Sequence, residues 1–165
     1  MCNGTAPVGT LRLSDLLTER TIRFHQRAAG WREAVRLAGA LLVRQGSVTA
    51  SYVEAMVRVV EEIGPYMVLA PGIAMAHARP EDGVVRACMS LVRLDSGVKF
   101  GSEVNDPVDL VFAFGAVDKE QHLEALRELA SLLQSDEGVA AIRRCRTARQ
   151  AARVVKRYSK LTKHV

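Results

Sequence analysis

The chain is predicted to fold as a single α/β domain, with a β-sheet flanked by helices on both faces. Segments with apolar residues at helical spacing occur before, between and after short apolar runs of strand length. This order is typical of helices that cover a sheet. The 165 residues, of which 48% are hydrophobic and 25% charged, suit one domain with its own core. There is no internal repeat and no low-complexity linker.

The first half of the chain is predicted to be mainly helical. Two stretches repeat apolar residues every three or four positions, and glycine or Gly-Pro follows each of them, as expected at helix ends. The expected elements are a disordered leader at 1–10, a helical turn after Ser14, a short strand at 21–24, a helix at 31–44 ending near Gly46, and a helix capped by Ser47 or Thr49 that ends at Gly64-Pro65.

The second half is predicted to supply most of the sheet and the remaining helices. Its apolar runs are rich in Val, Leu and Phe and are separated by Gly, Asn, Asp and Pro. The expected elements are strands at 66–70, 84–94 and 108–117, an extended histidine segment at 70–80, a helix at 120–133 that buries Leu123, Leu126, Leu129, Ala130 and Leu133, a helix capped by Asp136 that runs to about Arg144, and a basic helix at 147–157.

Positive charge is concentrated at the C-terminal end. The net charge is +5, yet nine of the 23 Lys and Arg residues lie in 143–165, which contains no acidic residue. The remainder has 14 basic against 18 acidic residues and is mildly negative. We therefore divide the chain into the leader at 1–10, a domain at 11–157 and a basic tail at 158–165, and expect the basic helix to present a solvated face.

Cysteine content and hydropathy point to a cytoplasmic protein. The three cysteines are odd in number and show no metal-binding spacing, which favours reduced thiols, and Cys88 lies in a strand pattern where it would pack in the core. No apolar run approaches the roughly 20 residues that span a bilayer, so no membrane insertion is expected. The N-terminal residues lack the charged and apolar regions of a secretion signal.

His77 is the principal candidate for chemistry. Alternate residues on an extended segment point to one side, so His77 and Arg79 are predicted to share a face, with Ala74, Ala76 and Ala78 on the other. A neutral imidazole can attack a phosphoryl donor and carry the group as phosphohistidine. The alternative for His77 is a satisfied structural histidine. The flanking prolines and small alanines favour a rigid, accessible ring.

Arg79 and His122 are predicted to complete the site. A guanidinium can neutralise and orient phosphoryl oxygens, although Arg79 could equally be a surface residue paired with Glu81 or Asp82. Asp118 and Gln121 resemble a capping box, which places His122 in the first turn of a helix, where the dipole favours a neutral ring and attracts anions. The alternative for His122 is a partly exposed helix residue.

Other chemistries find less support. A metal site would need more ligands than Asp109 or Asp118 could add to the two histidines. The sequence lacks the serine-elbow motif that would indicate a hydrolase. It also lacks a phosphate-binding glycine loop, which would indicate a bound nucleotide. We therefore expect no cofactor and no metal. His25 and His164 lack a comparable setting and are assigned to the surface.

Several ordered motifs resemble one known family. Residues 64–80 resemble the active segment of the enzyme IIA domains of the bacterial phosphoenolpyruvate-dependent sugar phosphotransferase system, within the mannitol/fructose superfamily and closest to its ascorbate-type branch. The resemblance covers about residues 11–145. The further matching runs are Trp31-Arg32-Glu33-Ala34, Tyr52-Val53-Glu54-Ala55-Met56, Phe100-Gly101-Ser102-Glu103, Asn105-Asp106-Pro107-Val108, Leu110-Val111-Phe112 and His122-Leu123.

The resemblance implies a mixed β-sheet and a phosphotransferase that works through a phosphohistidine. It implies that His77 is phosphorylated, that His122 is the second active-site histidine and that Arg79 is the arginine of the histidine motif. The donor would be the histidine phosphocarrier protein and the acceptor a cysteine of an enzyme IIB partner. We expect these partners to dock over an apolar rim near Met75 and the loop at 97–105.

One departure and three alternatives accompany this interpretation. Many relatives carry proline where this chain has Ala76, which loosens the backbone before His77 but removes no chemical group. The same fold could serve a regulatory protein whose phosphorylation state controls a partner. The basic C-terminal helix could instead bind nucleic acid, which is the less favoured reading. The oligomeric state is open, with a homodimer as one alternative, and the sugar is not determined.

Overall fold

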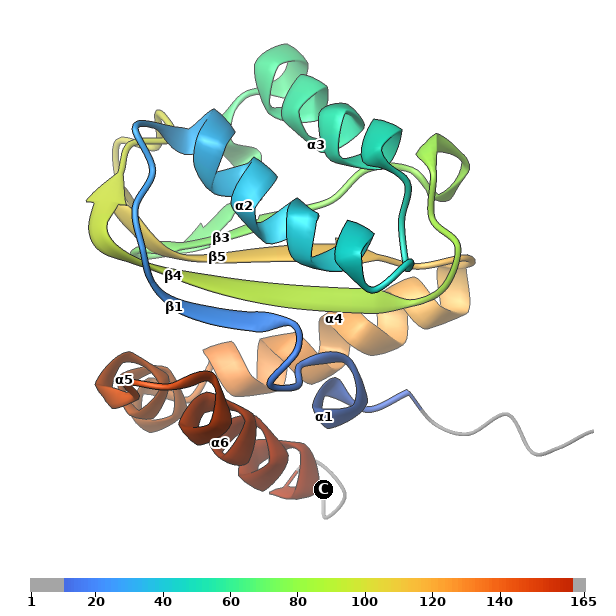
Figure 1. Ribbon diagram of the computed structural model, residues 1–165. Coiled ribbons are helices and arrows are strands. Elements are labelled where there is room, and N and C mark those ends of the chain that lie inside the picture. The colour runs from blue at the N-terminus through green and yellow to red at the C-terminus, as the bar shows by residue number, and fades with distance from the viewer. Residues whose placement is uncertain (1–10, 162–165) are drawn as a thin grey trace, which may run out of the picture.

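A mixed sheet of five strands forms the centre of the computed structural model, which describes residues 11–161 (Figure 1). The order across the sheet is β1-β4-β5-β3-β2. The β1/β4 and β3/β5 pairs are parallel, whereas β4/β5 and β2/β3 are antiparallel. The strands are β1 (Ile22–Gln26), β2 (Val68–Ala70), β3 (Ile73–Ala76), β4 (Cys88–Val98) and β5 (Val108–Gly115).

Helices cover both faces of this sheet, which confirms the predicted fold class. In Figure 1, α2 and α3 lie above the sheet and the other helices lie below it. Each layer encloses its own cluster of buried apolar side chains. The helices are α1 (Leu13–Leu16), α2 (Trp31–Arg44), α3 (Ala50–Ile63), α4 (Lys119–Leu133), α5 (Asp136–Arg144) and α6 (Ala148–Leu161), with short 3-10 turns η1 (Pro65–Met67) and η2 (Pro80–Asp82).

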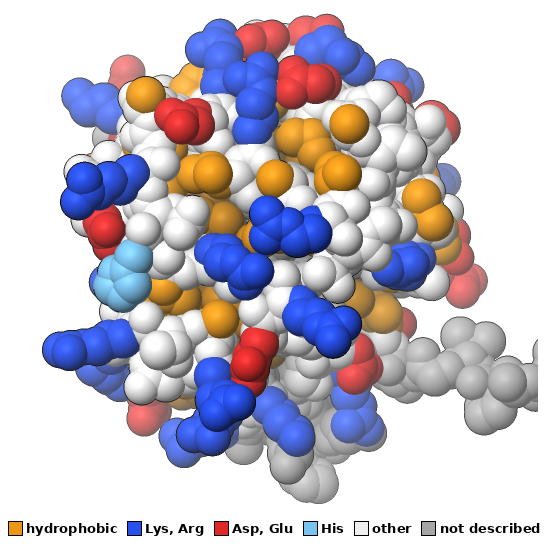
Figure 2. Space-filling model, in the orientation of Figure 1, with side chains coloured by type: hydrophobic (Ala, Val, Ile, Leu, Met, Phe, Trp, Pro, Cys, Tyr) orange, Lys and Arg blue, Asp and Glu red, His pale blue; other side chains and the backbone are white. Residues whose placement is uncertain are grey.

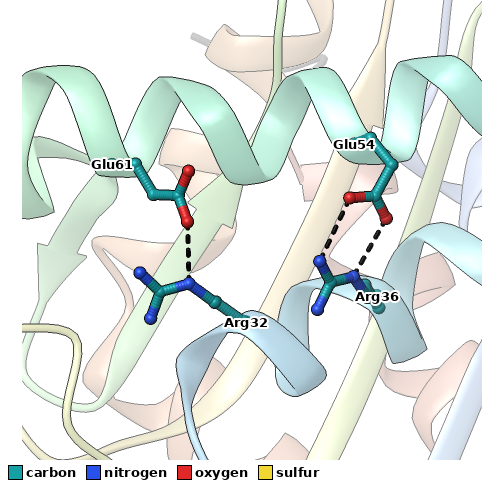
Figure 3. A network of polar contacts seen from close by, with 4 residues as sticks. All are labelled: Arg32, Arg36, Glu54 and Glu61. Atoms are coloured by element: carbon teal, nitrogen blue, oxygen red, sulfur yellow. Dashed lines mark hydrogen bonds and ion pairs between the residues drawn. The ribbon is translucent and has the colours of Figure 1, made fainter.

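The upper pair of helices is held together by close packing and by ion pairs across its exposed side. Gly39 of α2 lies so near Val53 of α3 that a Cβ there would meet the valine methyl groups at 2.7 and 2.8 Å. Arg32 and Arg36 of α2 bind Glu61 and Glu54 of α3 (Figure 3), with N–O distances of 2.8 and 2.9 Å. Exposed pairs stabilise little, so the apolar contact sets the packing and the ion pairs fix the alignment.

Strand β3 shows the alternation that the sequence predicts. Ala74 and Ala76 belong to the buried cluster beneath α2 and α3, whereas Ile73 and Met75 belong to the cluster beneath α4, α5 and α6. Ala78 continues the first set, because it packs against the upper cluster although the strand has ended. His77 therefore leaves the sheet on the α4 side.

Helix α4 differs from its prediction in the face that it buries. Its buried residues are Ala125, Leu129 and Leu132, while Leu123 is 59% exposed and Ala130 is also exposed. The helical spacing and the burial of Leu129 are confirmed, and Leu126 and Leu133 pack partly buried against the lower cluster, but the predicted burial of Leu123 and Ala130 is wrong. Spacing defines an apolar arc and does not say which part of a broad arc meets the sheet. The unburied part of the arc lies beside β2 and β3.

Smaller differences concern element ends. Tyr66 lies in the 3-10 turn η1 instead of a strand, because Pro65 starts a turn with its fixed φ. Ser135 caps α5 in place of the expected Asp136, since its hydroxyl accepts the Gly138 N–H at 3.0 Å. Helix α6 continues to Leu161, past the expected end at 157. The leader at 1–10, His164 and the end of the basic tail lie outside the described residues.

The basic C-terminal segment forms a solvated face, as expected. Ala151 and Val155 of α6 are fully buried against the lower cluster, and the charged side chains point outward. Lys and Arg side chains gather over α5 and α6 in the lower part of Figure 2. Two of them are ion-paired: Arg149 with Glu19 at 3.0 Å and Arg143 with Asp109 at 2.8 Å.

Gly72, in the turn between β2 and β3, is a position where only glycine fits. Its φ is +76°, and a Cβ there would meet the Arg143 guanidinium at 2.6 Å and the Asp109 carboxylate at 2.9 Å. We expect Gly72→Ala to lower the free energy of unfolding by about 1–3 kcal/mol, because it adds backbone strain and disturbs an ion pair. Urea unfolding measures the change. Gly30→Ala is the comparison variant: Gly30 has an extended backbone and no atom within 4 Å of the built Cβ, so it loses only the preference for glycine over alanine at the N-cap of α2, and a smaller effect is expected. Equal midpoints for the two variants would contradict the prediction.

Candidate active site

His77 stands immediately after β3, where the chain leaves the sheet. Its ring is partly buried, and its Nδ1 lies 3.2 Å from the backbone carbonyl oxygen of Met75. A carbonyl oxygen only accepts hydrogen bonds, so Nδ1 carries the proton and donates it. The lone pair of the neutral ring is then on Nε2, the nitrogen that remains available to attack an electrophile.

His122 occupies the first turn of α4, as the sequence predicts. Asp118 is the N-cap: its carboxylate accepts the Gln121 N–H at 2.8 Å, and its carbonyl accepts the His122 N–H at 3.1 Å. The capping box itself is only half formed, because the Gln121 side chain accepts from the Val117 N–H instead of the Asp118 N–H. The cap holds His122 where the partial positive charge of the helix start favours anions.

The fold brings the two histidines together. Their ring centroids are 5.8 Å apart in an edge-on arrangement. Phe114, the buried next-to-last residue of β5, touches both, with centroids 6.4 Å from His77 and 5.2 Å from His122. Tyr66 also lies against His77, with ring centroids 6.2 Å apart. Sequence reasoning missed both aromatic residues, because nothing in a strand pattern or a Gly-Pro turn marks a ring as part of a site.

This setting lowers the pKa of His122 from its ordinary value of 6.5. Burial is the larger cause, and the nearby His77 ring is the second, because both disfavour a charged imidazolium. His122 is therefore neutral near pH 7. A neutral ring still has one N–H to donate, and it adds no fixed positive charge to the site.

We expect an NMR titration to give His122 a midpoint below 6.5, and His77→Gln to move it upward by removing a titratable neighbour. The same shift makes stability depend on pH. Above pH 6.5 the ring is neutral in both the folded and the unfolded chain, and its contribution is constant. As the pH falls below 6.5 the unfolded chain binds a proton first, so stability decreases. An unchanged His122 midpoint in His77→Gln would show that the two rings are not coupled.

The structure does not bring Arg79 to the two rings. Its side chain is 79% exposed and lies 3.8 Å from the Asp82 carboxylate, in the pairing that the sequence offered as the alternative. Asp82 also accepts the Arg79 backbone N–H at 3.2 Å, which closes the 3-10 turn η2. An exposed pair at this distance is weak, so the guanidinium is free to exchange Asp82 for another anion.

An apolar groove of about 470 Å³ opens beside His77, between α4 and the β2–β3 edge. Leu126, Ala130 and Leu133 of α4 line one side and Leu69 of β2 the other. Met75, near which the sequence placed an apolar docking rim, is one of the residues that line this groove, although its own side chain is only 3% exposed. One wall of the groove is formed by apolar residues of α4 that are not fully buried against the sheet. The apolar periodicity of the helix could not show which of its apolar residues would stay accessible.

The remaining candidates lie elsewhere. His25 is exposed and binds Asp95 at 3.1 Å. Asp109 and Asp118, weighed as metal ligands, are engaged with Arg143 and the α4 N-terminus. Within residues 11–161 no group of three or more His, Cys, Asp or Glu is placed to hold a metal ion, and no helix there is both long and apolar enough to cross a bilayer.

Cys88 packs in the core, as predicted. It is buried at the start of β4, and burial raises the pKa of its thiol to about 12, which keeps it protonated and unreactive. Cys145 is also buried and unpaired, and burial is the main cause of its raised pKa. Neither thiol belongs to the site around His77.

Comparison with known proteins decides the family. The profile described as "Phosphoenolpyruvate-dependent sugar phosphotransferase system, EIIA 2" matches residues 15–158. The chain belongs to this family. An ascorbate-specific PTS system EIIA component of Escherichia coli strain K12 is 38% identical over 149 residues, which cover 89% of this chain and 97% of that protein. The family predicted from the histidine segment is thus confirmed, and the protein is an EIIA component of a sugar phosphotransferase system.

Solved EIIA structures share the fold. A putative PTS IIA (PtxA) from Streptococcus mutans superimposes with a TM-score of 0.83 at 31% identity, covering 91% of this chain and 96% of that one. The mannitol-specific cryptic phosphotransferase enzyme IIA CmtB of Escherichia coli gives 0.81 at 33% identity, with coverages of 89% and 99%. A complex of enzyme IIA and phosphorylated enzyme IIB for mannitol, also from Escherichia coli, gives 0.73 at 27% identity, with coverages of 83% and 94%.

Proposed function

We propose that this EIIA protein carries a phosphoryl group on Nε2 of His77, between the histidine phosphocarrier protein and a cysteine of an EIIB partner. The observation that supports this most is the pairing of His77 and His122 at 5.8 Å, with Nδ1 of His77 bonded to a carbonyl. One ring then has a free nucleophilic nitrogen, and the other offers an N–H donor beside it.

The first transfer follows from these positions. The Nε2 lone pair of His77 attacks phosphorus, a P–N bond forms, and the P–N bond of the donor breaks with its electron pair returning to the donor ring. The Met75 carbonyl accepts the Nδ1–H and so stabilises the positive charge that develops on the His77 ring. His122 and the start of α4 stabilise the charge on the phosphoryl oxygens. Arg79 exchanges Asp82 for the same oxygens.

The second transfer reverses these roles. A cysteine thiolate of the EIIB partner attacks phosphorus, an S–P bond forms, and the electron pair of the broken P–N bond returns to His77 Nε2. The Leu126–Leu133 side of the groove accepts apolar side chains of the partner proteins next to the reacting ring. The protein must bind the donor in the first step and the EIIB partner in the second. Each complex therefore has to dissociate readily, which a small interface allows. The exchange takes place in the cytoplasm.

The ascorbate-specific name of the 38%-identical relative favours an ascorbate-type sugar. The test is to add phosphorylated histidine phosphocarrier protein, find the labelled residue by mass spectrometry, and then add ascorbate-type or mannitol-type EIIB. We expect an acid-labile phosphate on His77 and faster discharge to the ascorbate-type partner. Label on another residue would overturn the proposed carrier, whereas discharge only to the mannitol-type EIIB would overturn the sugar class.

A further inference from the structure

The buried hydroxyl of Tyr52 joins the two backbone segments that carry the active-site rings. Tyr52 is in the first turn of α3, is 1% exposed, and has its ring in the upper apolar cluster. Its hydroxyl donates to the Phe114 carbonyl oxygen at 2.6 Å and accepts the Ala78 N–H at 3.1 Å. Ala78 follows His77 directly, and Phe114 contacts both histidine rings.

This contact lies where the sheet can no longer align the two strands. The parallel pairing of β3 with β5 ends at Ala76 and Ala113. One residue further, His77 and Phe114 no longer pair with each other, although Phe114 still pairs with Met89 of β4. Two residues beyond Ala76, the N–H of Ala78 has no strand partner in β5. The Tyr52 hydroxyl satisfies that donor and the opposing carbonyl together. A side chain of α3 therefore links the two segments just beyond the point where the hydrogen bonds between β3 and β5 end.

The hydroxyl also stays protonated in this position, as the two bonds require. Burial raises the pKa of Tyr52 well above its ordinary value. An uncharged hydroxyl has one hydrogen, which goes to the nearer Phe114 carbonyl at 2.6 Å while the Ala78 carbonyl lies at 3.3 Å, and its lone pairs accept the Ala78 N–H. Phenylalanine at this place would keep the packing of the ring but would remove the hydroxyl that binds the buried Phe114 carbonyl and the partly buried Ala78 N–H.

Taken together, the geometry points to Tyr52 as a positioning residue for phosphoryl transfer, an inference that rests on the proposed function of His77. Tyr52 touches neither ring nor the phosphoryl group. It holds the peptide on the C-terminal side of His77 against the end of β5, and thereby sets how the His77 ring faces Phe114 and His122. Because residue 76 is alanine, which leaves the backbone before His77 freer than proline would, this bond constrains a backbone that the sequence leaves flexible.

Tyr52→Phe tests the inference in the full chain with phosphorylated histidine phosphocarrier protein as donor. We expect the single-turnover rate of His77 phosphorylation at saturating donor to fall about tenfold, since one well-formed hydrogen bond orients the nucleophile. The donor concentration for half-maximal rate should stay the same, because the outer surface is unaltered. Ser90→Ala is the matched control: Ser90 is fully buried and donates to the Ala38 carbonyl at 2.7 Å on the opposite side of the sheet from His77.

If the Tyr52 hydroxyl only stabilises the fold, wild type, Tyr52→Phe and Ser90→Ala should show equal rates of His77 phosphorylation in samples that remain folded. That result would overturn the inference. A second measurement needs no variant. Hydrogen exchange in wild type should show the Ala78 amide protected, although it lies outside any strand. An unprotected Ala78 amide also overturns the inference. If wild type itself takes no label on His77, the proposed function fails, while the exchange result still decides whether Tyr52 holds the peptide.

Discussion

His77→Ala is expected to reduce phosphoryl acceptance to background. The imidazole supplies the atom that forms the new P–N bond in the proposed transfer. Among the histidines that the structure describes, no other lies in the same position: His122 faces it from 5.8 Å, and His25 lies at an exposed site bound to Asp95. The measurement is incorporation of labelled phosphate from the phosphorylated histidine phosphocarrier protein, followed by mass-spectrometric mapping.

Two further variants make this result specific. His77→Gln keeps most of the side-chain volume and polar character but cannot form phosphohistidine, so it should be as inactive as His77→Ala. His25→Asn removes a histidine far from the site and should label normally; asparagine tolerates the positive φ of 56° found there. Labelling of His77→Ala at the wild-type level would remove His77 from the mechanism, whatever the geometry of the pair.

His122→Ala is expected to separate the two half-reactions. Acceptance by His77 should persist at a reduced rate, because the nucleophilic nitrogen and its Met75 bond remain. Onward transfer to the EIIB cysteine should slow by about 100-fold, in line with the loss of one donor that stabilises a developing anion. Rapid mixing of labelled protein with the EIIB partner measures the second step alone.

The matched variant for this residue is His122→Gln. Its side-chain amide retains an N–H donor on the first turn of α4, so it should recover part of the lost onward rate, whereas alanine should not. If alanine and glutamine slow the step equally, donation by His122 is not what the reaction uses. Wild-type rates in both half-reactions for His122→Ala would exclude any role for this ring in the transfer.

Local chemistry made much of this fold predictable. Helix α2 has the predicted bounds of 31–44, because a strong 3.6-residue apolar period is flanked by glycines that end it on both sides. The start of α4 was likewise predictable, since Asp118 caps it through a hydrogen bond that reaches only three residues along the chain. Helix α5 shows the limit of such signals, as Ser135 and Asp136 are both good caps and neighbouring residues compete for one position.

The candidate site divides in the same way. His77 and His122 could be singled out from their own neighbours, and strand alternation correctly predicted that Ala74, Ala76 and Ala78 share one face, which is the face of the upper cluster. Arg79 was proposed beside His77 on the same alternation, but β3 ends at Ala76, so the rule no longer applied where it was needed. Once the strand stops, η2 and Asp82 determine where that side chain points.

By itself, the sequence determined the elements, the family and the two histidines, because caps, periodicity and turns act over a few residues. Tertiary structure alone decided that the rings meet, that the Tyr52 hydroxyl bridges Ala78 and Phe114, and that part of the α4 arc stays open as a groove. These contacts join residues up to 62 positions apart. They depend on how far each helix is rotated about its own axis when it packs on the sheet. The close packing of the two apolar layers together fixes that rotation.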